Sequence, residues 1–140
     1  MNNINFVFNP DKIEKIVDFE NNMLKEYSQI ISQYSDVFAE YGYSLDVGCI
    51  WINNRNKSKS SSRIIFQNGY SCYIYCDVLK NGEILCYDAN DEEADYYEAS
   101  TSWNISYISK SFFSLKVTLC PATDDIKDEM TRLLKTAKNL

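Results

Sequence analysis

The chain of 140 residues contains no histidine. Histidine is the commonest general acid or base near neutral pH and the commonest metal ligand, so its absence excludes the histidine-activated nucleophiles of most hydrolases. Paired carboxylates, as in glycosidases, leave a carboxylate-based enzyme of unknown substrate as an alternative. We expect a protein that is not an enzyme.

Glycine and cysteine are too few or too scattered to form the usual cofactor and metal motifs. The four glycines stand apart from one another, so phosphate-binding and dinucleotide-binding loops are absent. The five cysteines show no Cys-x-x-Cys spacing, which favours reduced, mostly buried thiols over a zinc site or a disulfide framework. We therefore expect no cofactor and no metal.

Long hydrophobic runs are also lacking. No apolar segment approaches the roughly 18 residues of a membrane-spanning helix, and the first residues do not resemble a signal peptide. We expect a cytoplasmic protein with no membrane partner. The net charge of −6 opposes direct binding to nucleic acid and favours encounter with a basic protein.

The length and the 45% share of hydrophobic residues suit one globular domain over residues 1–140. Asn9-Pro10-Asp11 combines a capping side chain, a proline for the first turn and an acid, which together predict a helix start. Apolar residues at three- and four-residue spacing extend this helix to Gly42, with a kink expected near Asn21-Asn22.

The pattern then changes to a period of two, which predicts strands. Alternating residues from Tyr43 to Trp51 predict a strand with one buried face, and residues 53–62 predict a basic loop before a short strand at Arg63–Gln67. Residues 103–119 predict either one long strand or a hairpin. Thr123-Asp124-Asp125 predicts the start of a last helix with an apolar stripe: Ile126, Met130, Leu133, Leu134 and Ala137.

Asn81-Gly82 predicts a tight hairpin turn, because a type I′ turn needs positive φ at both central residues. This register sets Lys80 opposite Glu83, Val78 opposite Leu85, Cys76 opposite Tyr87 and Ile74 opposite Ala89. Cys72 shares their face, which we expect to be buried. We expect the other face to be half exposed: Tyr73, Tyr75, Asp77, Leu79, Ile84, Cys86 and Asp88.

The predicted elements make an α+β fold with an N-terminal helix, an antiparallel sheet of four to six strands and a C-terminal helix. We expect both helices to pack on one sheet face.

The segment of residues 87–98 contains six acidic side chains and no basic side chain to offset their charge. A solvated acidic loop would explain them, and so would a contact surface in which acids meet Lys and Arg while tyrosines act as anchors. The predicted partner-binding residues are Tyr73, Tyr75, Asp77, Tyr87, Asp88, Asp91, Glu92, Glu93, Asp95, Tyr96, Tyr97 and Glu98.

Size and charge together are similar to those of small intracellular inhibitors such as immunity proteins and antitoxins. The first hypothesis is therefore an acidic inhibitor that binds and neutralises a basic toxin, for example a nuclease. A phage-encoded nucleic-acid mimic that blocks a host defence complex would use the same surface chemistry and remains the alternative among binding proteins.

Overall fold

The computed structural model describes residues 2–87, 97–122 and 125–140 and shows an α+β architecture. Within these residues a seven-stranded antiparallel sheet has the order β1-β9-β8-β4-β2-β3, and β5 pairs with the end of β4. The strands are β1 Ile4–Val7, β2 Ser44–Asn53, β3 Ser58–Ser60, β4 Tyr70–Lys80, β5 Glu83–Ile84, β8 Ser100–Ser111 and β9 Ser114–Leu119, while β6 Cys86–Tyr87 and β7 Tyr97–Glu98 form a separate ribbon.

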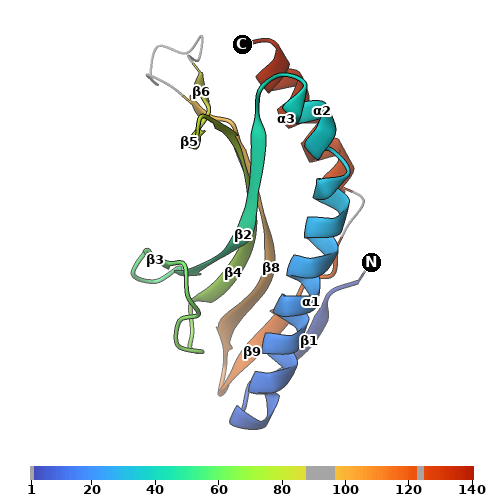
Figure 1. Cartoon of the computed structure of the whole chain (residues 1–140). Coiled ribbons are helices and arrows are strands. Elements are labelled where there is room, and N and C mark those ends of the chain that lie inside the picture. The colour runs from blue at the N-terminus through green and yellow to red at the C-terminus, as the bar shows by residue number, and fades with distance from the viewer. Residues whose placement is uncertain (1, 88–96, 123–124) are drawn as a thin grey trace.

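The helices lie together on one face of the curved sheet (Figure 1). They are η1 Pro10–Lys12, α1 Ile13–Ser32, α2 Ser35–Ala39 and α3 Asp125–Lys138. The predicted start is confirmed, since the Asn9 side chain accepts a hydrogen bond from the Asp11 N–H at 2.9 Å. The predicted kink at Asn21-Asn22 is wrong: α1 runs through it, and the helix breaks at residues 33–34 instead.

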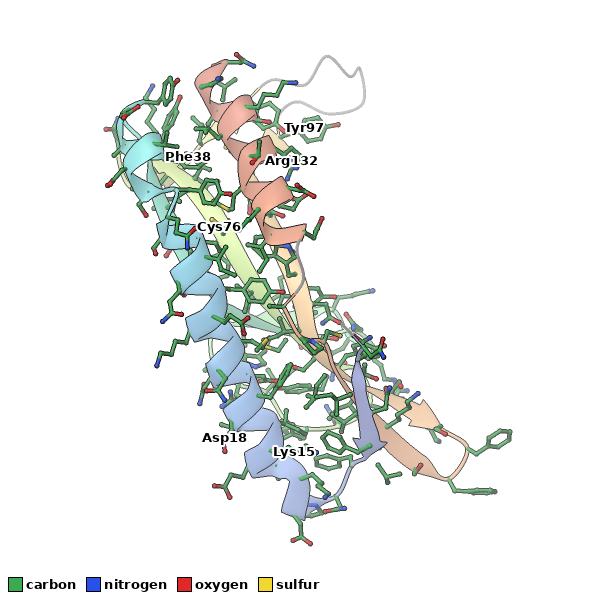
Figure 2. All side chains as sticks on the ribbon, turned by 90° about the vertical axis from the view of Figure 1, so that its right-hand side faces the viewer. Lys15, Asp18, Phe38, Cys76, Tyr97 and Arg132 are labelled. Atoms are coloured by element: carbon green, nitrogen blue, oxygen red, sulfur yellow. The ribbon has the colours of Figure 1, made fainter. Side chains whose placement is uncertain are left out.

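The core fills the space between the helices and the sheet (Figure 2). The predicted buried face of β4 is confirmed, with Cys72, Ile74, Cys76 and Val78 fully buried. The stripe of α3 is also confirmed, because all its members are buried except Leu134, which is half-buried. Among the residues that the structure describes, no helix is long and apolar enough to cross a membrane.

One carboxylate lies inside this core. Glu20 shares the buried stripe of α1 with Ile16 and Met23 and is only 1% exposed. Its two oxygens accept five hydrogen bonds: from Trp51 Nε1 (3.2 Å), Arg63 Nε (3.1 Å) and Nη2 (3.0 Å), the Tyr70 hydroxyl (2.5 Å) and the Ser106 hydroxyl (2.6 Å). A buried carboxylate is tolerated only with such compensation. We call Glu20 and these four donors the Glu20 clamp.

The clamp explains why the strand predicted at Arg63–Gln67 is wrong. These residues form no strand, and β3 lies earlier, at Ser58–Ser60. Arg63 turns inward to Glu20 and lies 5.2 Å from the Trp51 ring, while Phe66 packs on Tyr70 with ring centroids 4.8 Å apart. The segment is therefore held by side-chain contacts instead of a strand ladder.

The hairpin prediction is correct near its turn and wrong beyond it. Lys80 pairs with Glu83, and the Leu85 N–H donates to the Val78 carbonyl at 2.8 Å. Beyond this point Cys76 pairs with Thr101 and Val47, while Tyr87 pairs with Tyr97. Ile74 likewise lies between Cys49 and Trp103, because β2 and β8 occupy both edges of β4; Ala89 lies outside the described residues.

Residues 103–119 form a hairpin, which resolves the alternative left open by the sequence. A bulge shifts the β4–β8 register, so that Cys72 pairs with Ser106 and Tyr73 with Asn104. Side chains after the bulge change faces: Ile108 is buried, whereas Tyr107 is half exposed. The same shift turns Ser106 towards Glu20.

We predict that Glu20→Ala lowers the free energy of unfolding by about 3–5 kcal/mol, because it leaves the Arg63 charge and two buried hydroxyl groups without their acceptor. Urea denaturation followed by circular dichroism measures this loss. Glu26→Ala, on the exposed side of the same helix, is the matched control and should change stability by less than about 0.5 kcal/mol. Equal effects of the two substitutions would contradict the clamp.

Candidate functional site

The sheet face opposite the helices carries part of the predicted contact surface. Side chains alternate along β4, so Tyr73, Tyr75 and Asp77 point away from the buried cysteines of that strand. Asp46 of β2 lies directly opposite Asp77. Together with Glu98 of β7, which lines the same recess as Tyr75 and Asp77, these residues are called the tyrosine–carboxylate face.

A recess of about 380 Å³ opens on this face. Its floor comes from the central strands, and its margins come from β3 and the residue after it on one side and from β5 and β7 on the other. In Figure 1 the sheet is curved, and the helices lie on the opposite side from this recess. The lining residues are Cys49, Ile50, Lys59, Ser61, Tyr75, Asp77, Ile84, Glu98 and Ser100.

Two carboxylates face each other across the β2–β4 ladder. Asp46 and Asp77 are direct cross-strand partners, an arrangement of like charges that destabilises a sheet. Partial burial raises the pKa of Asp77, and the negative charges of Asp46 and Glu98 raise it further. The Ser100 hydroxyl opposes this shift by donating to Asp77 Oδ1 at 2.5 Å. The fold thus maintains a concentrated negative charge at this point.

The Tyr75 side chain is held in one position beside this pair of carboxylates. It is the cross-strand partner of Gly48, and a Cβ placed on Gly48 would lie 2.8 Å from the Tyr75 hydroxyl oxygen. The absence of a side chain at Gly48 therefore lets the tyrosine ring lie flat across β2. The Tyr75 hydroxyl donates to Asp46 Oδ2 at 3.3 Å. Partial burial and the neighbouring Asp46 charge both raise the pKa of Tyr75.

The second ribbon brings two more predicted residues together. Tyr87 and Tyr97 are cross-strand partners with ring centroids 5.8 Å apart, and Glu98 pairs with Cys86. Tyr87 packs partly against the core, whereas Tyr97 is more exposed. The remaining predicted residues lie outside the part of the chain that the structure describes: Asp88, Asp91, Glu92, Glu93, Asp95 and Tyr96.

The carboxylates of this face have no cationic partner among the described residues. The salt bridges among the described residues join Arg63 to Glu20 and Arg132 to Glu129, and neither involves a residue that lines the recess. Lys59 is the one basic residue among those lining it. The described carboxylates and thiols also form no group of three that could hold a metal ion. Chemically, the face is suited to accept hydrogen bonds from lysine or arginine.

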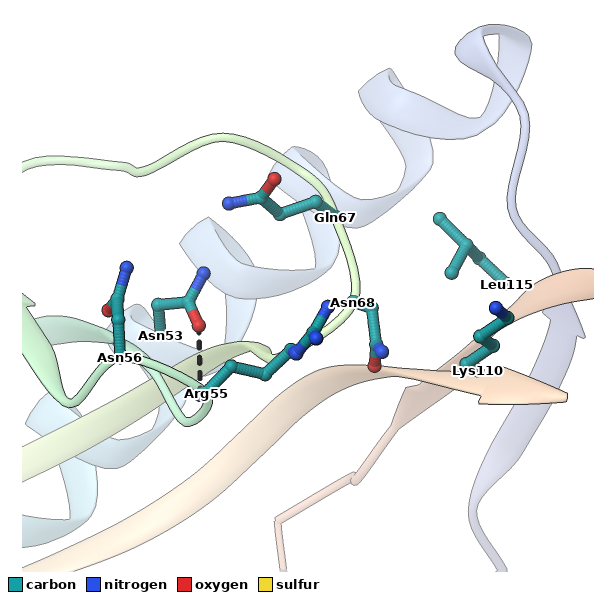
Figure 3. A pocket seen from close by; sticks show the side chains of 7 residues that line it. All are labelled: Asn53, Arg55, Asn56, Gln67, Asn68, Lys110 and Leu115. Carbon is teal, nitrogen blue, oxygen red and sulfur yellow. Dashed lines mark hydrogen bonds between the residues drawn. The ribbon is translucent and has the colours of Figure 1, made fainter.

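A second recess, of about 570 Å³, has the opposite character (Figure 3). It is lined by cationic and amide side chains together with one leucine: Asn53, Arg55, Asn56, Gln67, Asn68, Lys110 and Leu115. Asn53 Oδ1 accepts from the Arg55 N–H at 2.9 Å, and Gly69 leaves room for both residues. The predicted basic loop thus contributes to both recesses: Arg55 lines this positively charged one, whereas Lys59 lines the recess on the tyrosine–carboxylate face.

The sequence did not single out Asp46, Gly48 or Ser100. Their positions within alternating strands were visible, but their importance depends on the pairing of β2 and β8 with β4. Glu20 left a clearer indication, because it interrupts the apolar stripe four residues after Ile16 and three before Met23. A carboxylate at such a position predicts a buried, compensated charge.

Comparisons with family models, curated proteins and solved structures give no match to this chain, so its function has to be inferred from the chemistry of its own surface.

We predict that Asp77→Asn stabilises the fold at neutral pH by about 0.5 kcal/mol, because it removes the repulsion from Asp46 while an amide oxygen can still accept from Ser100. Folding raises the pKa of Asp77. The wild type therefore loses stability as pH rises through that pKa, and the advantage of the variant should vanish in acid, where Asp77 is protonated.

Urea denaturation at pH 3 and pH 7 measures the difference between Asp77→Asn and the wild type. Asp36→Asn, at an exposed acid on α2, removes the same charge outside the β2–β4 ladder and is the matched control. A variant that is less stable than wild type at pH 7 would contradict the repulsion between Asp46 and Asp77.

Proposed function

We propose that this chain is a small acidic inhibitor of the immunity-protein or antitoxin type, which binds a basic toxin such as a nuclease in the cytoplasm and neutralises it. The observation that carries the proposal is the pair of opposed carboxylates, Asp46 and Asp77, held beside Tyr75 on a recessed sheet face that none of the described helices covers. The electrostatics, the aromatic residues and the shape of this face all support binding to a cationic surface.

The electrostatic argument begins with the cost of the Asp46–Asp77 pair. Opposed like charges destabilise the free protein, and a lysine or arginine from a partner would relieve that repulsion on binding. Relief of this repulsion would therefore contribute to the free energy of binding. The net charge of −6 would also speed encounter with a basic protein.

The tyrosines supply the apolar part of such an interface. Tyr73 and Tyr75 are half exposed on β4, and tyrosine is enriched among the residues that dominate binding energy. The close packing of its ring on Gly48 and the hydrogen bond to Asp46 restrict the conformation of the Tyr75 side chain before binding. Less conformational entropy is then lost when a partner covers the ring.

These features suggest how inhibition would work. A nuclease binds phosphates with lysine and arginine side chains, and carboxylates can pair with the same groups. A protein surface in that position offers no phosphodiester bond to cleave. The tyrosine–carboxylate face would therefore block access of the nucleic acid to the toxin.

The test is affinity capture from the source cells with the wild-type chain and with the double variant Asp46→Asn/Asp77→Asn. We expect the wild type to retain one basic protein in stoichiometric amount, to lose it at high salt and to inhibit its activity after purification. The double variant should reduce the captured amount at least about tenfold, as expected for the loss of charges that contact a partner directly.

Asp36→Asn/Glu40→Asn is the matched control, because it removes two exposed acids, one in α2 and one directly after it, and leaves the tyrosine–carboxylate face intact. Equal losses in both double variants would show that net charge alone governs binding and would overturn the assigned site. Capture of a nucleic-acid-binding defence complex in place of a toxin would instead support the nucleic-acid mimic.

A further inference from the structure

The β8–β9 hairpin ends in two phenylalanines that contact almost nothing else in the molecule. Phe112 is 94% exposed and Phe113 is 101% exposed, and their ring centroids lie 6.2 Å apart. Figure 2 shows this hairpin projecting away from the helices and the rest of the sheet. Two adjacent aromatic rings exposed to water are unfavourable unless a partner covers them.

The turn itself gives no reason for phenylalanine. Ser111 pairs with Ser114, so Phe112 and Phe113 form a two-residue loop, like Asn81-Gly82 between β4 and β5. Asn81 and Gly82 have the positive φ angles of a type I′ turn, whereas the described non-glycine residues with positive φ do not include either phenylalanine. Neither turn geometry nor core packing explains these two side chains.

Basic residues flank the two rings. Lys110 pairs with Leu115 on the side of the sheet that faces the helices, and Lys116 pairs with Ser109 on the other side. Both lysines are exposed, and neither forms a salt bridge among the described residues. The projecting turn is therefore an apolar tip with one positive charge on each side.

A recess between α1 and β1 has the complementary chemistry. It measures about 540 Å³ and is lined by Ile4, Asp11, Glu14, Lys15, Asp18, Phe19, Asn22 and Leu119. Ile4, Phe19 and Leu119 supply apolar surface. The carboxylates of Asp11, Glu14 and Asp18 form no salt bridge among the described residues. Lys15 and Asp18 are labelled on the N-terminal part of α1 in Figure 2.

The one basic residue among those lining the recess is already engaged. Its ammonium group, on Lys15, lies 4.6 Å from the centroid of the Phe6 ring. Asp11 and Glu14 lie at the start of the helix, where its dipole favours acids, but Asp18 lies beyond the first turn, where that effect has faded. The negative charge of the recess thus exceeds what helix capping accounts for.

We propose that this chain forms a two-fold dimer in which the Phe112-Phe113 turn of each copy packs into the α1–β1 recess of the other. Lys110 and Lys116 then face the carboxylates of Asp11, Glu14 and Asp18. This surface is separate from the tyrosine–carboxylate face, so the dimer does not depend on the proposed function.

Geometry favours packing of the turn into the recess of a second copy over packing into the recess of its own chain. Leu119 of the recess and Phe113 of the turn lie at opposite ends of β9, about 20 Å apart at the rise of an extended strand. With exposures of 94% and 101%, Phe112 and Phe113 also do not pack in the recess of their own chain. In a two-fold arrangement each copy supplies one turn and one recess, and both contacts form at once.

The area also favours two contacts over one. A buried phenylalanine contributes about 150–250 Å². One turn in one recess, counted on both partners, falls short of the roughly 1,000 Å² typical of a stable interface, whereas two such contacts exceed it. The free edge of β1, with Ile4 and Val7 exposed, lies beside the recess and adds apolar surface.

The experiment is sedimentation equilibrium over a dilution series. We expect the wild-type dimer to have a dissociation constant below about 100 μM. Phe112→Ser/Phe113→Ser should raise that constant at least about 30-fold, the effect of losing aromatic residues central to an interface. Ile65→Ser is the matched control, because Ile65 is also exposed, at 74%, but lies outside the turn and the recess. It should leave the dimer unchanged.

A charge exchange locates the contact. Asp18→Lys alone and Lys116→Glu alone should each weaken the dimer, and the two together should restore it. A wild type that remains monomeric at about 100 μM, or a serine double variant that dimerises like wild type, would overturn the proposal. So would a monomeric wild type whose turn is needed to bind anionic lipid vesicles, since the two phenylalanines would then serve a membrane surface.

Discussion

The position of the long helix α1 on the sheet depends on one buried carboxylate. Glu20 connects α1 to β2 through Trp51, to β4 through Tyr70, to β8 through Ser106 and to residues 61–69 through Arg63. Hydrophobic packing alone tolerates small shifts of a helix along a sheet, but five directed hydrogen bonds to two oxygens do not. The clamp thus fixes where α1 lies relative to the three strands at the centre of the sheet.

Two of those strands also build the tyrosine–carboxylate face. The β2–β4 register that brings Trp51 and Tyr70 to Glu20 on the helix side also sets Asp46 opposite Asp77 and Gly48 opposite Tyr75 on the other side. A shift of one residue would exchange the two faces of a strand. The buried acid and the exposed acids are therefore linked through the backbone ladder, although they lie on opposite faces of the sheet.

Features with a local cause could be predicted from the sequence, whereas those created by distant pairing could not. The Asn9 cap, the Asn81-Gly82 turn and the alternating faces of β2 and β4 each depend on a few neighbouring residues. β1 was missed because four residues with mixed polarity give little periodicity, and it forms by pairing with β9. The bulge in β8 and the inward turn of Arg63 were missed because both depend on partners far along the chain.

The same limit applies to the candidate site. Tyr73, Tyr75 and Asp77 were placed on one face by alternation within β4 alone. Asp46 and Ser100 were not, because they reach Asp77 from strands on either side of it. Asparagine and glycine at a turn predict a hairpin well, as at Asn81-Gly82. Phe112 and Phe113 carry no such turn preference, so the sequence does not predict a turn there, and the fold does not explain why these exposed positions are phenylalanine.

The pairing of β1 with β9 has a consequence for synthesis. Ile4 lies opposite Leu119, and the Tyr43 hydroxyl donates to the Ala137 carbonyl at 3.1 Å, so these elements are completed by partners far along the chain. A chain emerging from the ribosome cannot close this sheet edge until β9 has emerged, because β1 pairs only with β9 among the described strands. Until then the exposed backbone and side chains of β1 can pair with other chains, so the nascent chain is prone to aggregate while β9 is still missing.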